Sequence, residues 1–138
     1  MSTETNKALT RRFYQEIVNQ KQLAVADELV ADNFVAHDLP AGLPPGPAGL
    51  KIFVGVFHSA FPDGQLSINQ MIAEGDTVAT RLTFHGTHTG EFQGIAPTGK
   101  AVAVPVLDVV RIVDDKAVEL WGGPNQLSLL QQLGVIPS

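Results

Sequence analysis

The chain has 138 residues, of which 44% are hydrophobic and 17% charged, with a formal net charge of −5 and no cysteine. This length and composition predict one folded domain over residues 1–138 and exclude disorder, disulfides, thiolate zinc sites and a cysteine nucleophile. Because the chain has only 9 Lys and Arg and no basic run, we expect neither nucleic acid nor an anionic membrane as its partner.

Helical spacing dominates the first half of the chain. Apolar residues recur every three or four positions in three segments, which predict three helices: residues 7–19, 23–30 and 48–61. In the first of these, Leu9, Phe13 and Ile17 form one stripe. A brief extended piece at 34–37 and a loop at 39–47, with four prolines and two glycines, separate the second helix from the third.

The second half of the chain is typical of strands. Four segments rich in Val, Ile, Thr and Phe predict strands: residues 66–73, 77–89, 101–113 and 117–121. Glu74-Gly75-Asp76 and Asp114-Asp115 have the composition of hairpin turns, and Asp115 tolerates a left-handed backbone. A glycine-rich connection over 90–99 joins the middle strands, and a short helix over 126–133 closes the chain.

Helices followed by a run of long strands predict an α+β fold in which three helices pack on one face of a curved antiparallel sheet. The strand over 101–113 is apolar on both faces, because Val102 and Val106 alternate with Ala103 and Leu107. One face can lie on the helices. A second copy of the chain is the simplest cover for the other face, which predicts a homodimer through the sheet.

Four local motifs in this order resemble the SnoaL-like polyketide cyclases of the nuclear-transport-factor-2-like superfamily, and the similarity runs over nearly the whole chain. The motifs are Asn33-Phe34-Val35-Ala36-His37-Asp38, Ala60-Phe61-Pro62-Asp63, the glycine-rich stretch 86–99, and the tail 121–134 with Leu129-Leu130-Gln131-Gln132-Leu133-Gly134. The resemblance implies a cone with an apolar pocket between sheet and helices. It also implies ring closure of an aromatic polyketide ester by intramolecular aldol condensation, without cofactor or metal.

The resemblance further implies an acid–base aspartate four residues after the tryptophan, and this chain has Asn125 at that position after Trp121. An amide cannot exchange a proton near neutral pH, and losing a positioned general base costs a factor of roughly 10²–10⁴. Asn125 could still donate a hydrogen bond to an enolate oxygen. Three alternatives remain: another group is the base, the chemistry differs, or the pocket only binds.

His37 and Arg111 are the other candidate catalytic residues. Histidine side chains exchange protons near neutral pH, and His37 follows a segment that rims the cavity in the resembling fold. A structural role beside the proline-rich loop is the alternative. The resemblance places Arg111 facing the pocket, where a guanidinium could stabilise an enolate; the alternative is an ion pair in solvent with Asp108, Asp114 or Glu119.

The candidate ligand-binding residues are Trp121, Phe34, Phe57 and Arg81. Trp121 could stack on an aromatic ligand, and Phe34 and Phe57 could form the pocket wall, although aromatic residues at such positions also simply fill cores. Arg81 could hold an acidic ligand if its sheet face lines the cavity, or face water if it does not. His58 borders the apolar stripe of the third helix, and we expect it at the surface.

These observations predict a cofactor-free lyase or isomerase, of the polyketide-cyclase type, that acts on a hydrophobic, oxygenated small molecule. A non-catalytic binding protein that uses the same pocket is the alternative. A third function, epoxide or ester hydrolysis, requires Asp108 and Arg111 on one sheet face. No metal is expected, because His85 and His88 point to opposite faces of a strand. With no signal-like N-terminus and no apolar stretch near the ~20 residues of a membrane span, we expect a soluble, cytoplasmic protein.

Overall fold

The computed structural model describes residues 2–40 and 42–137 of the chain. The helical elements are α1 (Thr3–Arg12), η1 (Phe13–Asn19), η2 (Leu23–Val25), α2 (Ala26–Leu29), α3 (Pro47–Ala60) and α4 (Gln126–Leu133). The strands are β1 (Val30–Ala36), β2 (Gln65–Glu74), β3 (Thr77–Thr87), β4 (Ala101–Val113) and β5 (Lys116–Pro124). The predicted α+β class, with helices first and long strands after them, is confirmed.

The five strands form one sheet in the order β1-β5-β4-β3-β2. Strands β2 to β5 pair antiparallel through consecutive hairpins, as predicted. The turn between β4 and β5 has left-handed backbone at both Asp114 and Asp115, with φ of 51° and 62°. The edge strand β1 differs from the prediction, because it runs parallel to β5. Because β1 and β5 are far apart in the chain, no short turn joins them or fixes their relative direction.

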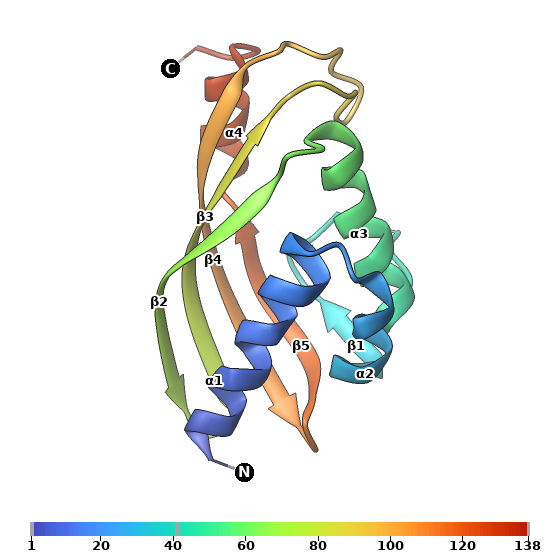
Figure 1. The fold of residues 1–138 in the computed structure, drawn as a ribbon, viewed down its shortest axis with the longest axis vertical. Helices are drawn as coiled ribbons and strands as arrows, with labels where there is room; N and C mark the ends of the chain where they lie inside the picture. The colour runs from blue at the N-terminus through green and yellow to red at the C-terminus, as the bar shows by residue number, and fades with distance from the viewer. Residues whose placement is uncertain (1, 41, 138) are drawn as a thin grey trace.

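The sheet curves around α1 and α3, and α4 lies beside the start of β4 near the C-terminus (Figure 1). The even-numbered residues of β4 face the helices and are buried, from Val102 to Ile112. Beyond the end of β5, the Gln132 side chain of α4 satisfies the backbone of Ala103, donating to its carbonyl at 2.8 Å and accepting from its N–H at 2.7 Å. None of the helices in the described ranges is long and apolar enough to cross a bilayer.

The first helix changes geometry midway. After Arg12 the α-helical α1 continues as a π-helix, η1, in which hydrogen bonds span five residues instead of four. One such bond runs from the Gln20 N–H to the Gln15 carbonyl at 2.9 Å. The apolar spacing of residues 7–19 predicted a helix here but did not reveal its wider turns. Short π-helical segments inside helices often occur at functional sites.

Candidate functional site

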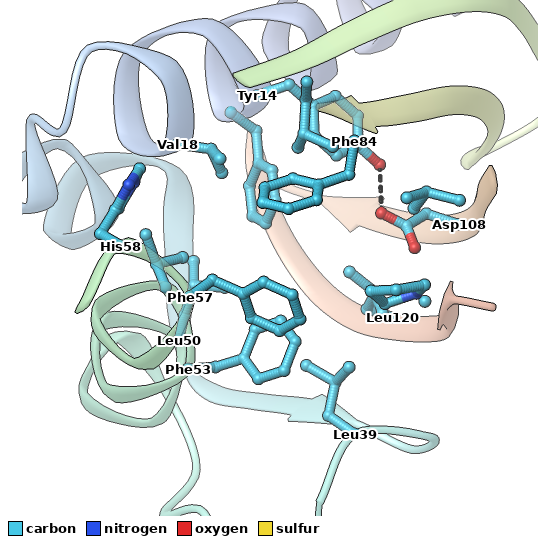
Figure 2. A pocket seen from close by; sticks show the side chains of 16 residues that line it. Tyr14, Val18, Leu39, Leu50, Phe53, Phe57, His58, Phe84, Asp108 and Leu120 are labelled. Carbon is cyan, nitrogen blue, oxygen red and sulfur yellow. Dashed lines mark hydrogen bonds between the residues drawn. The ribbon is translucent and has the colours of Figure 1, made fainter. Parts of the chain in front are cut away.

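A cavity of about 70 Å³ lies between η1, α3 and the concave face of the sheet. Its wall is mainly apolar. The rings of Phe53, Phe57 and Phe84 meet in its centre, and the Phe57 ring lies 5.1 Å from that of Phe53 and 5.4 Å from that of Phe84 (Figure 2). Such a wall accepts a hydrophobic molecule and leaves recognition to the few polar groups among the lining residues.

Asp108 is the one carboxylate among the residues that line this cavity. It projects from β4 with only 6% of its surface exposed. The Tyr14 hydroxyl, on η1, donates to Asp108 Oδ2 at 2.8 Å, and Tyr14 is 1% exposed (Figure 2). The two side chains form a buried dyad, which we call the Tyr14–Asp108 pair.

Burial determines the acid–base character of this pair. Removal from water raises the pKa of Asp108 to about 6, and the hydrogen bond from Tyr14 opposes that rise only in part. Burial, with the nearby Asp108 carboxylate, also raises the pKa of Tyr14 well above its ordinary value, so the phenol stays protonated and remains a donor. A carboxyl group with a pKa near 6 can take up and release a proton close to neutral pH.

Three residues of η1 line the cavity: Phe13, Tyr14 and Val18. In an α-helix, residues four apart share a face, and the wider π-helical turn changes which side chains project together. Phe13 and Val18 are five residues apart and both line the cavity, while Tyr14 reaches Asp108 from the start of η1.

Two further polar side chains have buried polar atoms near the Tyr14–Asp108 pair. Thr80 lies opposite Asp108 in the β3–β4 register, and its interaction with the Tyr14 hydroxyl opposes part of the rise in the Tyr14 pKa. Both ring nitrogens of His58 are also buried. The structure differs from the expected surface position of His58, because its helix turns it to the cavity wall, where burial lowers its pKa and favours the neutral ring.

Arg111, His37 and Trp121 lie on the opposite, convex side of the sheet and not in this cavity. The Arg111 Nε donates to Glu119 Oε1 at 2.6 Å, and His37 Nε2 lies 2.8 Å from Glu119 Oε2. The His37 ring stacks on Trp121 with a centroid separation of 5.1 Å. We call these four residues the convex-face cluster. Hydrogen bonds from His37 and Arg111 lower the pKa of Glu119.

Strand parity explains why Arg111 does not face the cavity. Residues three apart in a strand point to opposite faces, so Asp108 faces the helices and Arg111 faces away. The arrangement required for epoxide or ester hydrolysis through these two residues is therefore absent. Arg81 is likewise exposed on the convex face, beside Leu107 in the register.

Asn125 lies outside the cavity, as the N-cap of α4. It is exposed, and its Oδ1 accepts a hydrogen bond from the Ser128 N–H at 3.0 Å. This is the ordinary helix-capping use of asparagine. Gly123 and Pro124 still line the cavity. Gly122 and Gly123 adopt φ of 93° and 143°, and a Cβ at Gly122 would collide with the Leu107 carbonyl, so the end of β5 before Asn125 requires glycine.

The predicted wall residues divide between two places. Phe57 lines the cavity beside Asp108, whereas Phe34 is buried at 3% exposure outside its lining. Asp108 itself was missed as a pocket residue. In the sequence, Asp108 is a single charged residue on the same face of the predicted strand as Val106 and Val110, which are apolar. The opposite face of that strand is also apolar, so the alternation of residues did not show which face is buried.

No group of three or more His, Asp or Glu side chains in residues 2–40 and 42–137 is arranged to hold a metal ion. The polar side chains at the cavity are therefore the Tyr14–Asp108 pair, with Thr80 and His58 nearby. Such an arrangement has the groups needed to accept and donate a proton inside an apolar cavity.

Comparison with known proteins gives a consistent relationship. Residues 8–133 match the model of the SnoaL-like polyketide cyclase family. Comparison with curated proteins gives no match. Two solved structures are 31% identical to the chain: IdmH of Streptomyces antibioticus, a proposed polyketide cyclase, with a TM-score of 0.80 over 94% of this chain and 98% of that one, and AclR of Streptomyces galilaeus, a proposed hydroxylase, with a TM-score of 0.83 over 99% and 85%.

TsrD of Streptomyces laurentii has a higher TM-score, 0.89, at 22% identity, with 99% of both chains covered. At that identity the likeness concerns the fold. The three structures together agree with the helix-covered, curved sheet described above.

Proposed function

The chain belongs to the SnoaL-like polyketide cyclase family, and on that premise we propose that it catalyses cofactor-free ring closure of a hydrophobic, oxygenated molecule through the Tyr14–Asp108 pair. The observation that carries this proposal is a carboxyl group, buried in an apolar cavity, whose pKa is raised to about 6. The acid–base role that the resemblance implied at Asn125, the N-cap of α4, is assigned here to Asp108 on β4.

The proposed reaction needs only proton transfers and one new carbon–carbon bond. Asp108, as the carboxylate, removes a proton from a carbon flanked by two carbonyl groups. Once Asp108 is protonated, the Tyr14 hydroxyl donates its hydrogen bond to the enolate oxygen instead of to Asp108. The enolate carbon attacks a second carbonyl of the same molecule, whose carbon–oxygen double bond becomes an alkoxide. Asp108 then returns its proton to the alkoxide, so the enzyme ends as it began.

Proton exchange at the substrate carbon tests the first step without knowledge of the natural substrate. We expect the chain to accelerate deuterium exchange at C-2 of a methyl 3-oxoalkanoate in deuterated buffer, followed by proton NMR. Asp108→Asn should lower the rate by a factor of roughly 10²–10⁴. Asp32→Asn, which changes an exposed carboxylate, is the matched control and should leave the rate unchanged.

Three results would contradict the proposal or redirect it. Equal exchange rates for the parent chain and Asp108→Asn would remove Asp108 from the chemistry. Binding of these esters without accelerated exchange would support the alternative of a non-catalytic binding protein. Mass spectrometry of products from aromatic polyketide esters separates ring closure from hydroxylation, the activity proposed for AclR, because hydroxylation adds an oxygen atom.

We also propose that the active form is a homodimer joined through the convex face. A row of four side chains crosses four paired strands on that face: Ile72, Ala79, Val109 and Trp121. Ile72, at one end of the row, is 58% exposed. Leu107 adds an apolar side chain that is 59% exposed. Light scattering should find a dimer that Leu107→Glu separates and Leu127→Glu, on α4, does not; a monomeric parent chain would contradict the dimer.

A further inference from the structure

We infer that a second cavity, beneath the loop between β1 and α3, is the subsite for the part of the substrate that does not react. This inference deepens the proposed function, on which it rests for the position of the reacting end at Asp108. The ligand class is an extended apolar acyl or aromatic chain. The second cavity is lined on one side by β1 and on the other by the loop and the start of α3.

The volumes of the two cavities differ enough for them to hold different parts of one substrate. The cavity beside Asp108 measures about 70 Å³, whereas the second measures about 400 Å³. A volume of ~10–15 Å³ on this scale holds one water molecule, and pockets for drug-sized ligands span ~300–1,000 Å³. The inner cavity thus accepts a reacting fragment, and the remainder of a larger molecule needs the adjoining space.

The two cavities share a wall. Leu39 and Leu50 line both of them. Leu39 lies beside Phe53 at the edge of the inner cavity (Figure 2). Gly123 makes room for it, since a Cβ at that position would lie 3.3 Å from Leu39 Cδ2. A rotation of the Leu39 side chain is therefore the smallest change that would join the inner cavity to the outer one.

The backbone on both sides of the second cavity is fixed by hydrogen bonds. Asp38 Oδ2 accepts from the Gly122 N–H at 2.8 Å, which holds the chain next to Leu39 against β5. The Gly46 N–H donates to the Phe34 carbonyl at 2.8 Å, which holds the end of the loop against β1. The two hydrogen bonds attach one end of the loop to β5 and the other end to β1.

The lining defines the ligand chemistry. Phe34, Val35 and Leu43 contribute apolar surface, and His37 is the one side chain with ring nitrogens among the lining residues. One of those nitrogens is engaged with Glu119. The subsite therefore suits a mainly hydrocarbon chain that also carries polar atoms.

Chain-length dependence of binding tests this inference. The probes are methyl 3-oxoalkanoates from methyl 3-oxobutanoate to methyl 3-oxododecanoate, titrated by calorimetry. In the parent chain we expect the affinity to rise by roughly fourfold for each methylene that enters the second cavity. Leu43→Trp places an indole ring in the second cavity and occupies part of it, so the rise should end at a shorter chain and the longest ester should bind at least about tenfold more weakly, while the shortest ester is unaffected.

Leu127→Trp, an equal change on an exposed surface of α4, is the matched control and should retain the full length dependence. If Leu43→Trp does not fold, as judged by its thermal unfolding, Leu43→Ala replaces it. That variant should weaken binding of the long esters only, by roughly three- to tenfold, because it removes wall contacts. The same length dependence in Leu43→Trp and the parent chain, or no length dependence in the parent chain, would overturn the subsite.

This result is separable from that of the proposed function. Titration of Asp108→Asn with the same esters measures the subsite in a protein that lacks the proposed base. Retained length dependence with unchanged proton exchange would support the subsite and contradict the role of Asp108. Lost exchange without any effect of Leu43→Trp would support the role of Asp108 and overturn the subsite.

Discussion

A hydrogen-bonded carboxylate lies on each face of the sheet, Asp108 on β4 and Glu119 on β5, and the two differ in their access to water. On the concave face, Asp108 is 6% exposed and has Tyr14 as its hydrogen-bond partner. On the convex face, the Glu119 side chain is 26% exposed and is held by Arg111 and His37. Desolvation raises the pKa of the first carboxylate, and hydrogen bonds lower that of the second.

Of the two carboxylates, Asp108 is the better suited to accept and release a proton near neutral pH. Hydrogen bonds from His37 and Arg111 stabilise the charged form of Glu119, so this carboxylate has little tendency to accept a proton. Asp108 has one neutral donor and no facing cation among the lining residues, so its charged form is costly and its proton affinity is high. Residue types alone favoured the convex-face cluster, and burial favours the concave pair.

The largest effect should be an opposite pH dependence of stability on the two faces. The folded-state pKa of Asp108, about 6, lies above its unfolded value, so the folded protein loses stability as the pH rises from 4 to 7. Asp108→Asn removes that penalty. Relative to the parent chain, its free energy of unfolding should therefore improve by up to about 3 kcal/mol between pH 4 and pH 7, measured by urea unfolding.

Glu119→Gln is the comparison variant. Because the folded-state pKa of Glu119 is lowered, its contribution to stability is present above the unfolded pKa and is lost in acid. The deficit of Glu119→Gln should therefore be larger at pH 7 than at pH 4, the reverse of the trend for Asp108→Asn. The same trend in both variants would refute the contrast between the faces.

The second prediction concerns the pH dependence of proton exchange. If the carboxylate form of Asp108 is the base, the rate should rise with pH to a plateau above a midpoint near 6. At pH 4 it should lie about a hundredfold below the plateau. Glu119→Gln should keep the same midpoint, and a midpoint that moves with Glu119 would instead connect the convex-face cluster to the chemistry.

The third prediction separates the two members of the concave pair. Tyr14→Phe removes the hydrogen bond that we propose for the enolate oxygen, and hydrogen bonds to charged groups contribute about 1.5–3 kcal/mol, so the plateau rate should fall by about tenfold or more. The midpoint should move to higher pH, because Tyr14 lowers the pKa of Asp108. A reduced rate with an unchanged midpoint would limit Tyr14 to packing.

The smallest effect is expected at a residue that belongs to neither cluster. Asn125→Ala should lower the free energy of unfolding by about 1 kcal/mol through the lost cap of α4, and Asn125→Asp should retain it, since aspartate also caps helices. Thermal unfolding measures both. If Asn125→Ala abolished proton exchange in a stable protein, the position that the family resemblance indicated would outweigh Asp108.

Much of the fold was predictable because its signals are local. The bounds of β4 and α4 agree with the residue pattern, and Asp114-Asp115 specifies its hairpin through a backbone preference of those two residues. The parallel pairing of β1 was not predictable in this way. Its partner β5 is some eighty residues away along the chain, and no turn composition encodes such a contact.

The candidate site was less predictable, because it depends on contacts between distant elements. The sequence by itself determined the layering of helices and strands, the family, and the presence of an apolar interior. Only the tertiary structure decided which side of β4 is dry. Both sides are apolar in sequence, and the covering by η1 and α3 places Asp108 inside and Arg111 outside. A carboxylate gains or loses proton affinity through its surroundings, so its chemistry follows the fold and not its neighbours in the chain.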